Sequence, residues 1–171
     1  MGDFEDLSGY GLSPEQEATL LDRQVECVFM WTAADGGPVG VVMNFVAARG
    51  RFWLTAAERR PRVGAIRRVP NVALAVTSRG TDIGHSQSLT YRGRATVRTD
   101  RETKDWFYPA LASRVRPGDP ARQQAFARYL DSADRVVIEV EPTVRIGFDS
   151  APMFADKPDV GPSRHDPGAA S

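Results

Sequence analysis

The sequence is poor in the residues that most often carry side-chain chemistry. Its single cysteine, Cys27, allows no intrachain disulfide and leaves a cysteine-based zinc site without ligands. Its two histidines, His85 and His165, lie outside any motif that sets a nucleophile beside a base. Phosphate-binding loops and dinucleotide fingerprints are also missing. These absences indicate a protein whose reactive atom belongs to a bound cofactor, with no metal site of its own.

An excess of one charge and long apolar runs are absent as well. The 22 basic and 22 acidic residues give a formal net charge of zero, so the balance gives no reason to expect nucleic acid as a partner. No apolar stretch reaches the length that spans a bilayer, and the first ten residues are acidic rather than basic and apolar. We therefore expect a cytoplasmic protein without a membrane partner. All but two of the basic residues are arginines, which weakly favours recognition of planar anions.

The length of 171 residues fits one domain with a tail. Residues 1–150 contain the periodic segments and are expected to form the domain. Residues 151–171 are dominated by proline, glycine, aspartate and serine and have no periodicity. We expect this tail to be at least partly disordered.

The pattern of residues predicts a mainly β protein with peripheral helices. Ser13, Pro14 and Gln16 have capping-box spacing and begin a helix that runs to about Arg23. Runs rich in β-branched and aromatic residues predict strands at 25–33, 39–47, 51–56, 71–78, 88–99, 135–141 and 143–148. Further helices are expected at about 58–69, 100–116 and 121–130. Gly93 inside a strand indicates a bulge or a close backbone approach. Six or seven strands joined in this way indicate a closed or partly closed antiparallel barrel.

One short segment has the composition of a phosphate site. A strand ends at Thr55, and a polar loop with Arg59 and Arg60 leads into a helix that begins near Arg62. Hydroxyl, guanidinium and backbone N–H groups at a helix N-terminus together favour a bound phosphate. The alternative is that these arginines form only the solvated face of the helix.

The run from Val28 to Val97 resembles the pyridoxamine 5′-phosphate oxidase-like family of FMN-binding split barrels. The features that carry the resemblance are, in order, Asp35-Gly36-Gly37-Pro38, Val42-Met43-Asn44-Phe45, Phe52-Trp53-Leu54-Thr55, Arg62, Val69-Pro70-Asn71-Val72 and Tyr91-Arg92-Gly93-Arg94-Ala95. The resemblance implies a six- to seven-stranded antiparallel split barrel that forms a homodimer, with FMN at the subunit interface. It also implies an oxidoreductase that transfers hydride through the flavin to a small-molecule substrate.

The resemblance assigns cofactor-binding roles to five residues on two strands. Val42, Met43 and Asn44 are expected to line the isoalloxazine ring, mostly through backbone groups. Leu54 and Thr55 are expected to approach the ring and the ribityl chain. No catalytic side chain is implied.

Four further positions are assigned to the cofactor by the same resemblance. Arg62 stands where the family usually has a phosphate-binding lysine, and Arg60 is the nearest supporting charge. Gln87 and Ser88 are expected to reach the cofactor from the second subunit or from a neighbouring strand. Because the family's substrate-binding pattern near the C-terminus is replaced by Arg145 alone, pyridoxamine phosphate is not the expected substrate.

Three alternatives keep the fold but change the ligand or the function. An 8-hydroxy-5-deazaflavin coenzyme would use the arginine-rich loop for its polyanionic tail. A flavin-storing or haem-handling protein would not turn over, and His85 is the candidate haem ligand. A barrel without a cofactor would serve dimerisation or regulation.

Overall fold

The computed structural model describes residues 9–155 of the chain. Its strands are β1 (Glu26–Thr32), β2 (Pro38–Asn44), β3 (Val46–Ala48), β4 (Arg51–Ala57), β5 (Asn71–Thr77), β6 (Gln87–Arg98) and β7 (Arg135–Asp149). Its helices are α1 (Pro14–Arg23), α2 (Pro61–Arg68), α3 (Arg101–Val115), α4 (Pro120–Leu130) and α5 (Ala151–Phe154). The strands form one curled sheet in the order β2-β1-β5-β6-β7-β4-β3, and every neighbouring pair is antiparallel. The predicted split barrel of six to seven strands is confirmed.

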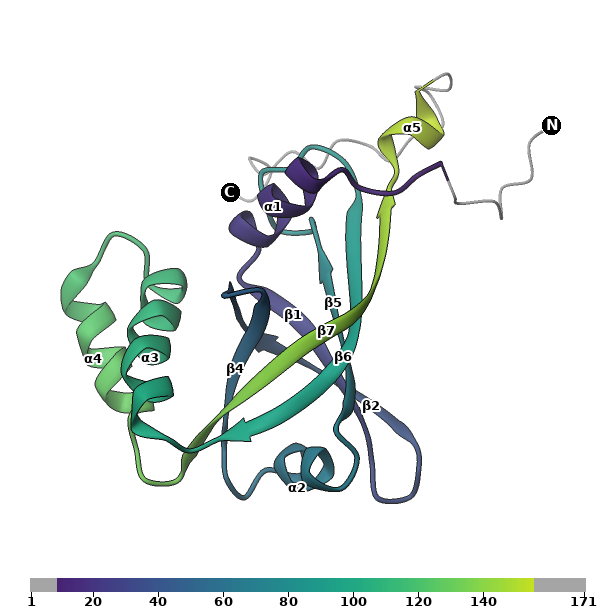
Figure 1. The fold of residues 1–171 in the computed structure, drawn as a ribbon. Coiled ribbons are helices and arrows are strands. Elements are labelled where there is room, and N and C mark those ends of the chain that lie inside the picture. The colour runs from purple at the N-terminus through teal and green to yellow at the C-terminus, as the bar shows by residue number, and fades with distance from the viewer. Residues whose placement is uncertain (1–8, 156–171) are drawn as a thin grey trace, which may run out of the picture.

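The helices close the sheet at three places (Figure 1). α1 and α2 lie at opposite ends of the barrel, and α3 and α4 form an antiparallel hairpin against its side. The capping box predicted for α1 is present: the Gln16 backbone N–H donates to the Ser13 hydroxyl at 3.2 Å, and the Gln16 side chain accepts from the Ser13 N–H at 2.8 Å. This reciprocal pair satisfies two of the backbone donors that a helix start leaves free. Among the described residues, no helix is both long and apolar enough to cross a membrane.

A separate hydrophobic cluster packs on each face of the sheet. The barrel interior contains alternate residues of each strand, among them the fully buried Phe29, Leu74 and Leu89. The opposite face is packed under the α3–α4 hairpin, where Trp53 and Phe107 are buried. This alternation follows from the two-residue period of a strand, which sends successive side chains to opposite faces.

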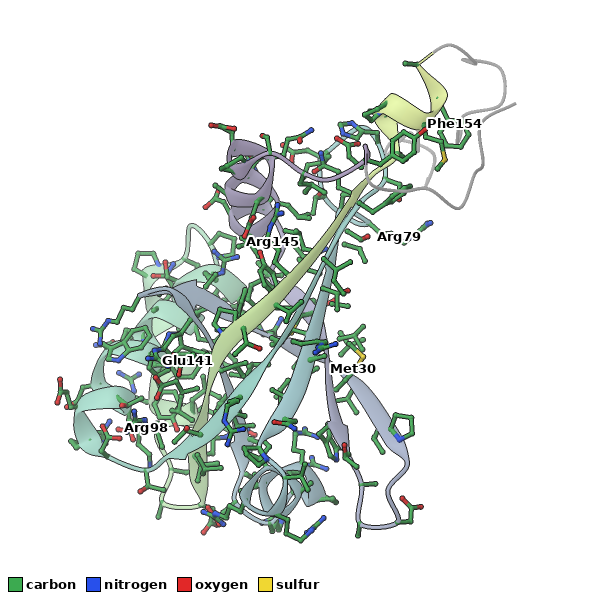
Figure 2. The ribbon with its side chains drawn as sticks, turned by 45° about the vertical axis from the view of Figure 1, so that its right-hand side comes forward. Met30, Arg79, Arg98, Glu141, Arg145 and Phe154 are labelled. Carbon is green, nitrogen blue, oxygen red and sulfur yellow. The ribbon has the colours of Figure 1, made fainter. Side chains whose placement is uncertain are left out.

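The outer face of the sheet is covered at one end alone. The strand register places one row of outward residues across five strands, namely Val42, Val28, Ala75, Thr90 and Ile146. The next row is Gly40, Met30, Ala73, Arg92 and Val144. We call these ten residues the bare face, because no helix of residues 9–155 covers them and Val28, Val42 and Ile146 are 37%, 64% and 56% exposed. Met30 projects from this side of the molecule in Figure 2.

Two strand predictions need correction. The strand expected at 39–47 is divided into β2 and β3 at Phe45, because that side chain turns into the core and the chain changes its partner from β1 to β4. The two strands expected at 135–141 and 143–148 are one strand, β7. β7 continues past Pro142 because the proline falls at a bulge, where its missing N–H breaks no regular ladder bond.

The first residues of the predicted tail form a helix. Residues 151–154 form the short helix α5. The disorder expected within the tail concerns residues 157–171. Residues 156–171 lie outside the described part of the chain.

The glycine at position 93 is required by a close backbone approach. A Cβ atom at Gly93 would lie 2.3 Å from the carbonyl oxygen of Glu141 on β7, where the β6–β7 register shifts. The prediction of a bulge or close approach at this position is therefore confirmed.

Gly93→Ala should destabilise the protein by about 1–3 kcal/mol, because backbone on β7 must move to make room. Urea unfolding followed by circular dichroism measures the loss. Gly64→Ala in α2 is the matched control, since its nearest non-neighbour atom would lie 3.7 Å away and helix propensity favours alanine. Equal stabilities of the two variants would contradict the assignment.

Candidate functional site

The barrel is open between two strand edges. Within residues 9–155, β2 pairs with β1 alone, and β3 pairs with β4 only over Arg51–Trp53. The second half of β4, residues 54–57, therefore has β7 on one side and no strand on the other. Backbone N–H and C=O groups along these edges are free to bind a ligand.

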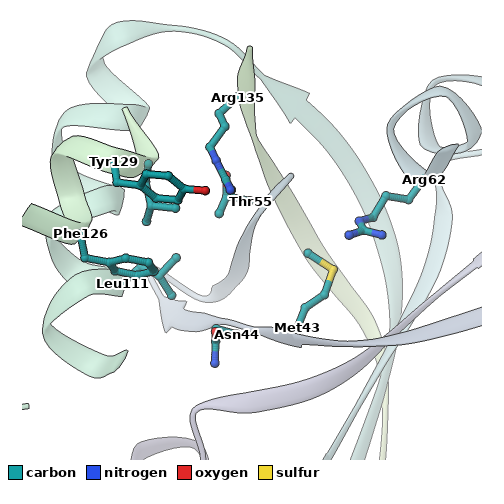
Figure 3. Close-up of a pocket in the computed structure, with 9 residues that line it drawn as sticks. Met43, Asn44, Thr55, Arg62, Leu111, Phe126, Tyr129 and Arg135 are labelled. Atoms are coloured by element: carbon teal, nitrogen blue, oxygen red, sulfur yellow. The ribbon is translucent and has the colours of Figure 1, made fainter. Parts of the chain in front are cut away.

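A pocket of about 230 Å³ lies at this opening (Figure 3). It is lined by Met43, Asn44, Thr55, Arg62, Leu111, Phe126, Tyr129, Leu130 and Arg135. The first four come from β2, β4 and α2, and the remainder come from the α3–α4 hairpin and the start of β7. Two arginines and no carboxylate line the pocket, so its charge favours an anionic ligand.

Arg62 lies at the pocket, and no acidic side chain of residues 9–155 pairs with its charge. Pro61 sets the start of α2, and the N-cap Arg60 makes no side-chain capping bond, so the helix N-terminus is open. The Arg62 guanidinium lies 5.7 Å from the centroid of the Trp31 ring, and its Nε is buried with no hydrogen-bond partner among the described residues. Burial and the nearby charge of Arg60 lower the pKa of Arg62, although arginine stays protonated at neutral pH. A bound anion would relieve both penalties.

Thr55 and Asn44 add polar atoms to the same pocket. The Thr55 hydroxyl donates to the carbonyl oxygen of Val136 at 2.9 Å, and the buried Tyr108 hydroxyl lies beside it. The Asn44 amide makes a long bond, 3.4 Å, to the carbonyl oxygen of Val25. With Met43 and Arg62, these residues are the four predicted site residues that the structure brings together.

Three predicted residues lie next to the pocket but do not line it. The Leu54 side chain is fully buried in the barrel interior, so it can present only its backbone to the opening. Val42 points to the bare face and is 64% exposed. Arg60 is exposed in the loop before α2. Their contacts with a cofactor remain predictions.

Gln87 and Ser88 lie at the start of β6, outside the pocket of their own chain. The Gln87 side chain is buried and donates to the Asp149 carboxylate at 3.3 Å, which also accepts from Gln16 at 2.6 Å. His85 Nε2 lies 3.2 Å from the same carboxylate. Gln87 and His85 therefore belong to a polar cluster that joins α1 to the ends of β6 and β7, and their roles toward a flavin or a haem remain predictions.

Arg145, the loose candidate for substrate binding, has partners within the fold. It pairs with Glu17 of α1 and donates to the carbonyl oxygen of Leu12 at 2.9 Å. Figure 2 shows Arg145 beside α1. In this structure its charge is used to hold α1 against β7.

The residues of the helical hairpin were missed by the sequence analysis. Phe126 and Tyr129 are three positions apart on α4, a spacing that is equally typical of a helix facing the core. Arg135 begins β7, after the loop that follows α4. Their place in the pocket depends on how the hairpin docks beside β4. In the structure, Tyr129 is distinguished from a core residue by its exposure, which is 69%.

Cys27 is excluded as a nucleophile by its surroundings. Its side chain is buried in the barrel interior, and burial raises the pKa of the thiol to about 12. At neutral pH the thiolate is therefore almost absent. Within residues 9–155 no group of three or more acidic, histidine or cysteine side chains is placed to hold a metal ion.

Cys27 should resist thiol reagents while the protein is folded. At pH 8 we expect its reaction with dithionitrobenzoate to be at least about a hundredfold slower than that of the unfolded chain, whose thiol has an ordinary pKa. Absorbance of the released thiol measures both rates. A fast reaction of the native protein would show that the interior opens on the time scale of the reagent.

The open antiparallel sheet defines the fold as a split barrel, with a cationic pocket at the split. The family model described as Pyridoxamine 5′-phosphate oxidase matches residues 13–145, and the chain belongs to that family. No curated protein matches the chain.

Solved structures share this fold. A conserved hypothetical protein, Rv2991 from Mycobacterium tuberculosis, is 15% identical with a TM-score of 0.71, over 87% of this chain and 90% of that one. An FAD-binding protein from Mesorhizobium loti is 17% identical with a TM-score of 0.61, over 81% and 95%. An F420 reductase is 25% identical with a TM-score of 0.59, over 78% and 98%.

Proposed function

We propose that this protein is an FMN-dependent oxidoreductase that binds its cofactor at the split of the barrel, with the phosphate on Arg62. The observation that carries the proposal is the half-buried Arg62 guanidinium, which has no ion-pair partner among residues 9–155 and lies at the open N-terminus of α2. A phosphate monoester carries negative charge and several acceptor oxygens, which match the guanidinium group and the backbone N–H groups of this site.

The other pocket residues have roles that follow from their positions. Thr55 offers a hydroxyl oxygen to the ribityl chain, and the unpaired edge of β2 at Met43 and Asn44 offers backbone groups to the polar rim of the ring. Bound FMN supplies the hydride-transferring atom, so the chain needs no nucleophile. Its own residues bind, orient and shield the cofactor from water.

A second copy of the chain completes the site in this proposal. The pocket of one chain holds about 230 Å³, which is below the roughly 300–1,000 Å³ typical of pockets that enclose a ligand. The bare face supplies a surface for pairing, since four of its five strands present apolar outward residues with no helix above them, and β6 contributes Thr90 and Arg92. Ser88 lies on β6 next to this face and two residues from Thr90, within reach of a partner's cofactor.

The deazaflavin coenzyme is a second candidate because of one comparison. The F420 reductase shares 25% identity over 98% of its length, and its name states a deazaflavin cofactor. The exposed Arg59 and Arg60 could pair with additional negative charges of such a coenzyme. Titration of the protein with FMN and with the deazaflavin separates the two cofactors.

Arg62→Ala should weaken FMN binding by about 1.5–3 kcal/mol, because it removes a charge-assisted contact to the phosphate. Quenching of flavin fluorescence during titration measures the affinity. The control is Arg68→Ala, which removes an exposed arginine from the last turn of the same helix and should leave the affinity nearly unchanged. Unchanged binding in Arg62→Ala would place the phosphate elsewhere.

Ile146→Arg should convert a dimer into a monomer and weaken FMN binding, because two copies of the new charge would be buried in the pairing face. Analytical ultracentrifugation measures the mass. Ala121→Arg adds the same charge to an exposed site on α4 and should leave the dimer intact. A wild-type protein that sediments as a monomer while binding FMN tightly would refute the pairing.

A further inference from the structure

The pocket has a second wall whose chemistry differs from that around Arg62. Phe126 and Tyr129 on α4 lie with ring centroids 6.5 Å apart and planes within 16° of parallel. Tyr129 is 69% exposed, so it is not held in place by burial in the core. Arg135 at the start of β7 places its guanidinium carbon 5.7 Å from the centroid of the Tyr129 ring. We call Phe126, Tyr129 and Arg135 the hairpin wall.

Arg135 forms no ion pair with an acidic side chain in the part of the chain that the structure describes. The nearby Asp131 is used by Arg101, which contacts both of its carboxylate oxygens at 2.8 and 3.0 Å. The backbone N–H of Arg135 donates to the carbonyl oxygen of Ser132, which fixes the turn that presents its side chain. The Arg135 guanidinium is therefore free to bind an anion in the pocket.

The hairpin wall and Arg62 enter the pocket from different sides. Figure 3 shows Arg62 extending from α2, while Arg135 and the hydroxyl end of Tyr129 extend from the opposite side, with Thr55 and Met43 between them. The pocket thus has two guanidinium groups on different walls. The one at Arg135 is bordered by Phe126 and Tyr129, two aromatic residues that themselves line the pocket.

We propose that the hairpin wall is a substrate subsite that takes a planar conjugated carboxylate, with the carboxylate on Arg135 and the ring against Phe126 and Tyr129. This subsite rests on the proposed function, in which Arg62 and the β2 edge hold the cofactor. A carboxylate matches the two-pronged guanidinium, and a flat ring matches a near-parallel aromatic pair. Apolar Leu111 and Leu130 also line the pocket and favour contact with the apolar ring of the ligand.

Three probes of matched size test the subsite: 2-naphthoate, 2-naphthylmethanol, which keeps the rings without the charge, and decahydronaphthalene-2-carboxylate, which keeps the charge without the planar rings. Isothermal titration calorimetry is carried out on the protein reconstituted with FMN. We expect 2-naphthoate to bind at least about tenfold more tightly than either of the other two, as one charge-assisted contact and one aromatic contact contribute.

Arg135→Gln distinguishes the subsite from a general effect of charge. It should remove most of the difference between 2-naphthoate and 2-naphthylmethanol while leaving the weak binding of the alcohol unchanged. Arg128→Gln, on an exposed position of α4, is the control and should preserve the difference. Equal losses for both probes in Arg135→Gln, or no loss for either, would overturn the proposal.

The cofactor titration keeps this proposal separate from the function proposed above. Arg135→Gln should bind FMN as tightly as the wild type, whereas Arg62→Ala should not. If Arg135→Gln lost FMN affinity to the same extent as Arg62→Ala, Arg135 would belong to the phosphate site and the subsite would be refuted. If the wild-type protein bound no FMN, the proposed function would fail, and 2-naphthoate binding to the apoprotein would still decide the subsite.

Discussion

The incomplete pairing of β4 is the constraint on which the rest of the structure depends. β3 is short and covers only Arg51–Trp53, so the sheet does not close onto β2. The division of the strand at Phe45 causes this, because its buried side chain directs the chain away from β1. A closed barrel would have paired the free edges of β2 and β4 and removed the opening between them. The split is therefore the feature that leaves a pocket beside an otherwise continuous sheet.

Among the half-buried arginines of residues 9–155, only the two in the pocket have no hydrogen-bond or ion-pair partner for the side chain. Arg51 and Arg98 share the buried carboxylate of Glu139, at 3.1 and 2.5 Å. Arg145 pairs with Glu17. By contrast, the two arginines that line the pocket have no acidic partner among the described residues. In a chain with no net charge, this local excess of positive charge is what favours an anionic cofactor and an anionic substrate at the same opening.

The sequence could predict features that depend on neighbouring residues along the chain. The capping box at Ser13, the close approach at Gly93 and the basic helix start at Arg62 are local signals, and the structure contains all three. Contacts between distant segments could not be predicted in this way. The wall built from Phe126 and Tyr129 arises from the docking of the hairpin beside β4, and an aromatic pair three positions apart has the same period whether it faces a core or a pocket. Leu54 illustrates the same limit, since a strand residue beside the opening can still point into the interior.

A comparison of FMN with riboflavin tests the central claim most directly, because the two ligands differ only in the phosphate. If the free charge of Arg62 at the split binds that phosphate, FMN should bind at least about tenfold more tightly than riboflavin. This advantage should disappear in Arg62→Ala, with riboflavin affinity left unchanged. Equal affinities of the wild-type protein for the two flavins would contradict the account.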